Sequence, residues 1–230
     1  MNARLSLLFL CIIGLLSAQH YKNDRQTKNF KDKVKTVTTT TSTIGKNGKI
    51  TKKNTSQETF SLNGDIETLK LDGKTYHYKY QYNEKGQKYA AALLDEGENN
   101  PNNVSTFIYD DSSNRIIEYL DIKRWFININ TFDEHGTLTA TTLYNIPENK
   151  EITTLMHYNA HGDIERISVE QTSTNIDTKH QSIQQTTAPV QHYTFKYTNY
   201  DAHGNWTECI TYLDNKKVET IQRQMTYDED

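Results

Sequence analysis

Hydrophobic and polar residues alternate along most of this 230-residue chain after its N-terminus. Aromatic residues take every second position in residues 76–82 and 193–197, and residues 138–144 alternate in a similar way. A period of two is typical of a strand with one buried face. The abundance of Tyr and Thr favours half-buried strands, and no later stretch carries a long apolar set at helical spacing. The pattern therefore predicts an almost entirely β protein.

A short phrase recurs five times after residue 80 and sets the spacing of these strands. Each copy consists of an aromatic residue, Asp or Asn, two or three variable residues, and then Gly or Asn. The copies span residues 82–86, 109–114, 132–136, 158–162 and 200–204, and a sixth begins at Tyr227. The leading aromatics are 27, 23, 26, 42 and 27 residues apart. This spacing indicates about one two-stranded hairpin per copy.

Turn geometry explains the phrase. Asp or Asn is preferred at the first position of a type I turn, and Gly at the fourth position adopts a positive φ at little cost. A type I turn followed by a left-handed residue forms a common three-residue hairpin loop with a bulge. We expect the left-handed conformation at Gly86, Asn114, Gly136, Gly162 and Gly204.

Three weaker turns precede the five copies, at residues 44–50, 62–66 and 71–74. Each contains a Gly directly after Asn or Asp, which is a strong turn signal between hydrophobic runs. We therefore expect an all-β fold in which successive antiparallel β-hairpin repeats form a twisted, open sheet. Such a sheet has two unpaired edges, which invite strand addition by a partner.

The N-terminus has the features of a secretory signal peptide. Arg4 precedes an apolar run at residues 5–16, and the small residues Ser17 and Ala18 follow it. The run is shorter than the roughly 20 apolar residues that a transmembrane helix needs. We expect residues 1–19 to be removed on export to the periplasm or the cell exterior, leaving no integral membrane segment.

The remaining chain divides by composition into a basic Lys- and Thr-rich segment, residues 20–55, and the hairpin repeat domain, residues 56–230. The first holds ten Lys or Arg against two Asp, and the second holds 15 Lys or Arg against 27 acidic residues. The basic segment is either a solvated lead-in strand or a tail that contacts an anionic lipid or polysaccharide surface. Nucleic acid is not an expected partner, because the body is acidic and carries no groove-reading motif.

The widest spacing between phrases contains an insertion near residues 171–191, which is rich in Gln, Thr and Ser and has few apolar residues. We expect a mobile loop there. Because loops carry function more often than scaffolds do, this loop is a candidate contact site.

The sequence offers no clear catalytic group. Cys209 is the single cysteine after signal cleavage and lies in a strand-like run, where a small buried hydrophobe is the simpler interpretation. Glu165 and Glu208 occupy nearly matching places after two turns, but such pairs arise by chance among 27 acidic residues. We expect no enzyme, no catalytic residue and no cofactor.

Histidine precedes the turn Gly in three copies, at His135, His161 and His203. That turn position suits polar residues for structural reasons. Hairpin tips two strands apart also lie about 10 Å from each other, too far for shared metal ligation. We therefore expect no metal site.

Trp125 and Trp206 are the best candidates for a binding surface. Rings exposed on one sheet face would stack on sugar rings or on a peptide strand. The alternative is that both rings belong to the core, as most aromatic residues of a thin sheet do.

The phrases at residues 158–166 and 200–208 resemble the YD repeats of the RHS family. They are also similar to Tyr-Asp-x-x-Gly-Asn-Trp variants in short secreted proteins of the Bacteroidetes, and the likeness covers about residues 76–230. The family's Gly-Arg-Leu after the turn appears only as Asn114-Arg115-Ile116. The large RHS proteins build shells around a cargo, for which five or six copies are too few. The resemblance implies a β-hairpin repeat scaffold at the cell envelope.

These features together predict a non-enzymatic secreted or periplasmic β-repeat protein that acts as an interaction or structural module. The expected partner is an envelope protein or polysaccharide. One alternative is a carbohydrate-binding protein that uses exposed aromatics, and another is a glycoside hydrolase, which needs a cleft with two facing carboxylates.

Overall fold

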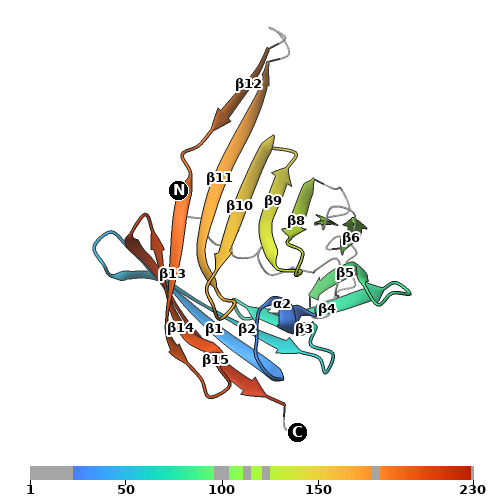
Figure 1. Cartoon of the computed structure of the whole chain (residues 1–230), viewed down its shortest axis with the longest axis vertical. Helices are drawn as coiled ribbons and strands as arrows, with labels where there is room; N and C mark the ends of the chain where they lie inside the picture. The colour runs from blue at the N-terminus through green and yellow to red at the C-terminus, as the bar shows by residue number, and fades with distance from the viewer. Residues whose placement is uncertain (1–22, 96–103, 111–114, 121–124, 178–181, 229–230) are drawn as a thin grey trace.

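The computed structural model describes residues 23–95, 104–110, 115–120, 125–177 and 182–228. The expected signal peptide, residues 1–19, and the turn residue Asn114 lie outside the described residues. Within them, the chain forms one short helix and fifteen strands (Figure 1). The elements are α2 (Asp24–Thr27), β1 (Val34–Ile44), β2 (Ile50–Phe60), β3 (Ile66–Leu71), β4 (Lys74–Tyr82), β5 (Lys88–Asp95), β6 (Val104–Asp110), β7 (Arg115–Tyr119), β8 (Phe126–Phe132), β9 (Leu138–Asn145), β10 (Lys150–Tyr158), β11 (Ile164–Asp177), β12 (Ser182–Thr187), β13 (Gln191–Tyr200), β14 (Trp206–Leu213) and β15 (Lys216–Tyr227).

The strands close into a 14-strand antiparallel barrel. Each strand from β1 to β11 pairs with the next along the chain, β11 is followed by β13, β14 and β15, and β15 pairs with β1. β12 pairs with β11 and is not part of the ring. The expected all-β class is confirmed, whereas the expected open, twisted sheet is wrong. The pairing of β1 with β15 removes the two edges that an open row of hairpins would expose.

The seam between β1 and β15 has the form of a hairpin turn supplied by two distant segments. Residues 36–43 pair with residues 219–226 in antiparallel register. Beyond this pairing, the Asp228 N–H donates to the Lys33 carbonyl at 2.9 Å. In the complete turns the same bond links the first turn residue to the residue four positions later. The sixth phrase therefore forms one half of a turn, and the residues before β1 form the other half.

The repeated phrases place their turns at one end of the barrel, here called the turn end, because consecutive ring strands are antiparallel. The φ angles are 75° at Gly86, 72° at Gly136, 80° at Gly162 and 81° at Gly204. The Asp201 carboxylate accepts hydrogen bonds from the N–H groups two and four residues later, at 3.0 and 2.9 Å. The same pair of bonds is made by Asn83, Asp133 and Asn159. These bonds explain why the phrase needs Asp or Asn directly after its aromatic residue.

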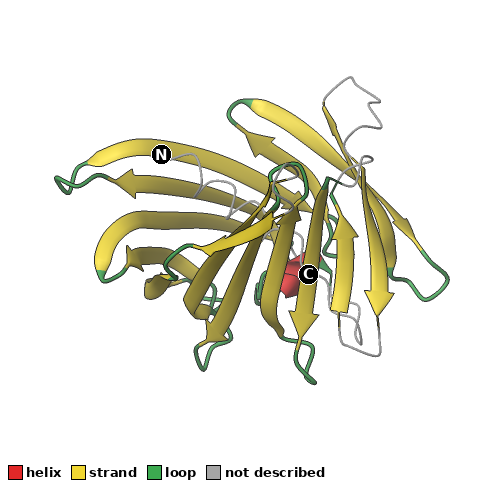
Figure 2. Ribbon diagram, turned by 90° about the horizontal axis from the view of Figure 1, so that it is seen from above, coloured by secondary structure: helices red, strands yellow, loops and turns green. Residues whose placement is uncertain are grey.

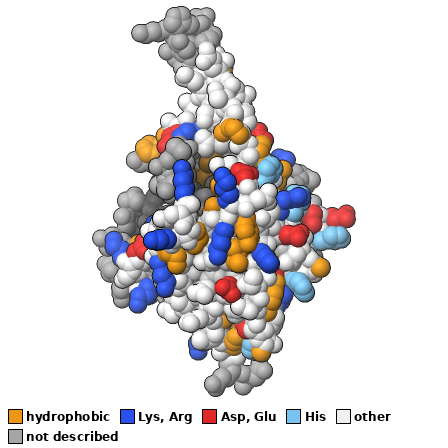
Figure 3. Space-filling view, turned by 90° about the vertical axis from the view of Figure 1, so that its left-hand side faces the viewer, with side chains coloured by type: hydrophobic (Ala, Val, Ile, Leu, Met, Phe, Trp, Pro, Cys, Tyr) orange, Lys and Arg blue, Asp and Glu red, His pale blue; other side chains and the backbone are white. Residues whose placement is uncertain are grey.

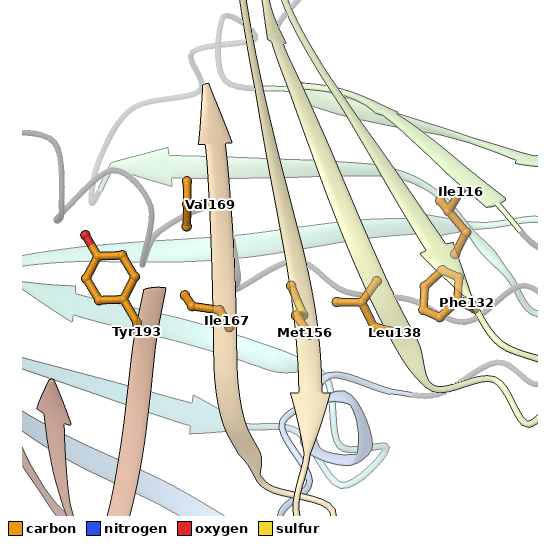
Figure 4. Close-up of a cluster of buried hydrophobic side chains, with 7 residues drawn as sticks. All are labelled: Ile116, Phe132, Leu138, Met156, Ile167, Val169 and Tyr193. Atoms are coloured by element: carbon orange, nitrogen blue, oxygen red, sulfur yellow. The ribbon is translucent and has the colours of Figure 1, made fainter. Parts of the chain in front are cut away.

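Two hydrophobic clusters fill the inward faces of the strands. The larger cluster lies along β7 to β13 and consists of Ile116, Phe132, Leu138, Met156, Ile167, Val169 and Tyr193 (Figure 4). The smaller cluster lies at the turn end and consists of Val34, Val37, Phe60 and Ile66. Each strand contributes alternate residues to the interior, as the period-two pattern requires.

Residues 23–33 cross the turn end and fill part of it (Figure 2). α2 begins with a capping box, in which the Asn23 side chain accepts from the Gln26 N–H at 2.9 Å and the Gln26 side chain accepts from the Asn23 N–H at 3.1 Å. Residues Arg25, Asn29, Lys31 and Asp32 hydrogen-bond, respectively, to Gly64, Asp163, Asn205 and His203 in the turns. Most of the basic segment, residues 34–55, lies in β1, β2 and the turn between them.

The expected loop at residues 171–191 is corrected in one respect, because most of its described residues form strand. β11 extends to Asp177, and β12 pairs with it from Ser182 to Thr187. The two strands form an arm that reaches beyond the rest of the barrel (Figure 1). Ile183 on this arm is 73% exposed. A ribbon that is solvated on both faces lacks the alternating apolar pattern by which strands are recognised in sequence.

Candidate functional site

A buried group of one lysine and two aspartates lies where α2 meets the barrel. Lys88 Nζ is 2.8 Å from Asp24 Oδ1 and 2.8 Å from Asp65 Oδ1. The three side chains are only 2%, 8% and 5% exposed, respectively. The ammonium also lies over the Tyr80 ring, with Nζ 4.0 Å from the ring centroid, which is a cation–π contact. We call Lys88, Asp24 and Asp65 the buried triad.

Hydrogen bonds fix the orientation of both carboxylates in the buried triad. Asp24 Oδ2 accepts from the Ile66 N–H at 2.8 Å and from the Tyr80 hydroxyl at 3.0 Å. The Tyr82 hydroxyl donates to Asp65 Oδ2 at 2.6 Å. Burial, together with the nearby Asp24 carboxylate, raises the pKa of Tyr80, so that its hydroxyl stays protonated and remains a donor. Each carboxylate therefore has one oxygen held by donors and one oxygen facing the lysine.

A second polar group lies on the inner wall formed by β7 and β8. Glu118 and Asn128 are opposite each other in the strand register and are 6% and 1% exposed. Asn128 Nδ2 donates to Glu118 Oε2 at 3.4 Å. Burial raises the pKa of Glu118 to about 7. Burial likewise raises the pKa of Glu219, on β15, to about 7. Both interior carboxyl groups thus titrate near neutral pH.

Trp206, one of the two predicted binding residues, is half-buried. Its ring centroid lies 5.2 Å from that of Tyr197, and Arg223 Cζ lies 3.5 Å from the Trp206 ring centroid. Burial lowers the pKa of Arg223 to about 10, which leaves the guanidinium charged at neutral pH. Because Tyr197 and Arg223 both contact the Trp206 ring, this ring is not free to stack on a sugar.

The central part of the outward face of β6 to β9 is apolar, and Thr106, Arg115, Thr131 and Thr142 lie around it at outward positions. Strand register aligns two rows of side chains across these strands, and the rows consist of Ile108, Ile117 and Ile129, and of Tyr119, Ile127 and Tyr144. Their neighbours along the strands, such as Ile116 and Asn128, are buried inside, so the rows point outward. Ile108 is 50% exposed. We call these six residues the outer wall.

Trp125, the other predicted binding residue, extends the outer wall at the end opposite the turns. It precedes β8 and lies on the same face as Ile127 by strand alternation. Its carbonyl accepts from the Ile146 N–H at 2.9 Å. Trp125 and Ile146 are 47% and 49% exposed. The structure therefore places Trp125 on the surface, beside other apolar residues.

Outward residues on other strands are mainly polar. On the two seam strands, for example, they are Thr36, Thr38 and Thr40 on β1 and Thr220, Gln222, Gln224 and Thr226 on β15. On the face seen in Figure 3, polar and charged side chains separate the hydrophobic ones into small groups. A membrane-spanning barrel carries an apolar band on its outward face. The polar residues of β1 and β15 interrupt any such band.

The three turn histidines do not share a ligand site. His203 Nδ1 is 2.8 Å from Asp32 Oδ2, and His135 Nε2 is 3.5 Å from the adjacent Glu134. The His161 ring lies 6.0 Å from that of Tyr200. In the part of the chain that the structure describes, no group of three or more His, Cys, Asp or Glu residues is arranged to hold a metal ion.

The residues considered for catalysis are also apart. Burial raises the pKa of the Cys209 thiol to about 12, so it stays protonated at neutral pH. Glu208 on β14 accepts from Asn199 Nδ2 at 2.6 Å and from Thr198 Oγ1 at 3.0 Å. Glu165 is exposed on β11, and β13 lies between β11 and β14.

The sequence interpretation missed the buried triad and the outer wall. Lys88 directly follows its turn at an inward position, and the equivalent residues of later copies are Leu138, Ile164 and Trp206. A lysine at a position that is otherwise apolar was the available signal. For the outer wall, the signal was β7 itself, where Ile116 and Ile117 place one apolar side chain on each face.

No helix among the described residues is long and apolar enough to span a membrane. No family model and no curated protein sequence matches the chain. Among solved structures, a porin-like protein from Bacteroides uniformis is similar at 13% sequence identity and a TM-score of 0.29, over 84% of this chain and 98% of that protein. A TM-score this low supports no argument about shared structure or activity.

Proposed function

We propose that this protein is an exported, non-enzymatic interaction module of the cell envelope, and that a partner protein docks on the outer wall. The supporting observation is the pair of apolar rows on β6 to β9, bordered by polar outward residues. A patch of Ile and Tyr side chains that contains no charge and has a polar border resembles the centre of a protein–protein interface.

A protein partner fits this patch better than a lipid bilayer does. The outer wall covers four neighbouring strands, whereas a bilayer would contact the outward face of the whole ring. Trp125 and Ile146 continue the patch to the rim, where a partner can enclose them. Large aromatic side chains of this kind frequently carry much of the binding energy of an interface.

Site-specific photo-crosslinking tests the docking surface. A photoreactive phenylalanine analogue replaces Ile108 or Ile127 in the exported protein, and matched controls carry it at Thr38 or Gln224 on the polar wall. We expect one protein adduct that forms from the outer wall positions and not from the controls. Adducts to lipid alone, or equal adducts from both walls, would contradict the proposal.

Fractionation tests the expected compartment. The apolar run at residues 5–16 supports export. We expect osmotic shock of the producing cells to release the mature protein, or the culture medium to contain it. Recovery solely from membranes after detergent extraction would show that the barrel is embedded in lipid.

Carbohydrate binding is a second candidate function that rests on Trp125, since Trp206 is engaged by Arg223. Envelope polysaccharide that is retained by the immobilised protein and lost from the Trp125→Ala variant would favour it. A Trp206→Phe variant serves as the control, because it keeps an aromatic ring at the half-buried position.

A further inference from the structure

We propose that Lys88 and Asp24 become joined by an isopeptide bond, with Asp65 as the proton carrier. The bond would link the segment that crosses the turn end to β5 of the barrel. The inference does not depend on the proposed docking function, because it concerns a buried site on different strands.

The geometry brings the two reacting groups into contact. Lys88 Nζ is 2.8 Å from Asp24 Oδ1. Both side chains are fixed, because the lysine lies over the Tyr80 ring and the aspartate belongs to the capped helix α2. Holding a nucleophile and an electrophile together in this way replaces a bimolecular encounter and lowers the barrier greatly.

Asp24 Oδ2 lies between two hydrogen-bond donors, the Ile66 N–H at 2.8 Å and the Tyr80 hydroxyl at 3.0 Å. When the amine adds to Cγ, negative charge develops on the carboxyl oxygen that is retained. Two donors already directed at that oxygen stabilise the tetrahedral intermediate, as in an oxyanion hole.

Asp65 is placed to move protons. Its Oδ1 is 2.8 Å from Lys88 Nζ, and the Tyr82 hydroxyl holds its other oxygen. A carboxylate within hydrogen-bond distance of the ammonium can accept a proton from it and return that proton to the leaving oxygen.

The step balances without any co-reactant. The Lys88 Nζ lone pair forms a bond to Asp24 Cγ, and the bond from Cγ to Oδ1 breaks with its electron pair leaving on the oxygen. Nζ gives up two of its three protons through Asp65, and the leaving oxygen takes both and departs as water. One ammonium and one carboxylate become a neutral amide, and Asp65 ends as it began. The reaction removes the opposite charges of Lys88 and Asp24 and leaves Asp65 as a carboxylate whose Oδ2 still accepts from the Tyr82 hydroxyl.

The structure also contains a matched ion pair that should remain non-covalent. Lys28 Nζ is 2.9 Å from both carboxylate oxygens of Glu58, but the two side chains are 15% and 11% exposed. The Lys88 side chain is 2% exposed. Access of water to the Lys28 pair keeps the ions hydrated and disfavours condensation to an amide.

The mass of the intact, purified mature chain tests the proposal. We expect a mass lower than that of the sequence by one water. A tryptic digest should lack cleavage after Lys88 and contain one branched peptide that joins the segments around Asp24 and Lys88. Peptides containing Lys28 and Glu58 should be unmodified in the same digest.

Three variants separate the bond from the ion pair. Lys88→Arg keeps a positive charge and should show the unmodified mass. Asp24→Asn should still react but lose ammonia instead of water. Asp65→Asn should leave most of the chain unreacted while its circular dichroism spectrum stays that of the wild type.

Normal tryptic cleavage after Lys88 together with an unmodified wild-type mass would overturn the proposal and leave the buried triad as an ion pair. Complete bond formation in Asp65→Asn would overturn the role assigned to Asp65. Both readouts are masses, so neither depends on finding a docking partner.

Discussion

At the scale of single residues, Gly204 illustrates the backbone conformation that a turn position requires. Its φ of +81° is disfavoured for any residue with a Cβ, while a Cβ built there meets no atom within 4 Å. We therefore expect Gly204→Ala to lower the free energy of unfolding by about 1 kcal/mol through backbone strain alone. Urea denaturation measures this loss.

Gly162 is the matched control for Gly204, because its φ is +80° but a Cβ there would lie 3.3 Å from the Asn29 side chain. Gly162→Ala should lose more stability than Gly204→Ala, since it also disturbs the segment that crosses the turn end. Zero loss in both variants would contradict the turn geometry, and equal non-zero losses would contradict the added effect of the Asn29 contact.

Glu118 provides a pH-dependent prediction. Its pKa in the folded protein is about 7, against an ordinary value of 4.5. The neutral carboxyl is favoured in the folded state, so this stabilisation is fully present below pH 4.5 and is lost as the pH rises through 7. A shift of this size corresponds to a few kcal/mol, about 1.4 kcal/mol per pKa unit.

The Glu118→Gln variant isolates this effect, because Gln stays neutral and still accepts from Asn128. Between pH 5 and pH 8 the wild type should lose about 2–3 kcal/mol of stability more than the variant does. Chemical denaturation at several pH values measures the difference. Parallel curves for the two proteins would show that Glu118 does not titrate in this range.

At the scale of elements, the arm formed by the end of β11 and β12 should be dispensable. The pairing of β11 with β10 ends at Ser173, and its pairing with β13 ends at Val169. Residues 175–186 lie beyond both pairings and make up the arm. Replacing residues 175–186 with a short Gly-containing turn should change the free energy of unfolding by less than about 1 kcal/mol, because exposed segments contribute little. A large loss of stability would show that the arm supports the ring.

The elements also show how much of the fold could be predicted from the sequence. Turn chemistry is local, so the phrase at residues 200–204 indicates a hairpin from a few residues. The arm was missed because its side chains face water on both sides. The buried triad was missed because it joins residues 24, 65 and 88, which only the closed barrel brings together. Trp125 could be proposed from sequence, but its apolar neighbours on other strands could not.

At the scale of the whole molecule, closure rests on one long-range pairing. β1 and β15 pair although most of the chain separates them in sequence. Unlike a hairpin, this pairing is not specified by a turn sequence between the two strands. The open sheet was expected for that reason. The signal available was the sixth phrase at Tyr227, because a turn phrase needs a second strand and the structure pairs β15 with β1.

Removing residues 216–227 tests closure. The truncated chain loses Ile221 and Tyr227 from the interior and exposes the backbone of β1 and β14. We expect it to lose cooperative unfolding and to become sensitive to protease, unlike the chain with the shortened arm. A truncated protein that unfolds as cooperatively as the wild type would show that the seam is not required.

The seam also has a consequence for the girth of the barrel. Because the closing turn is assembled from the same phrase as the internal turns, inserting or deleting one whole phrase keeps both partners of the seam intact. Each phrase adds two strands, and the circumference of a closed sheet grows with the number of strands. The number of phrases in the sequence therefore determines the diameter. Chains with more or fewer phrases would form barrels of different diameters that close through the same pairing of first and last strands.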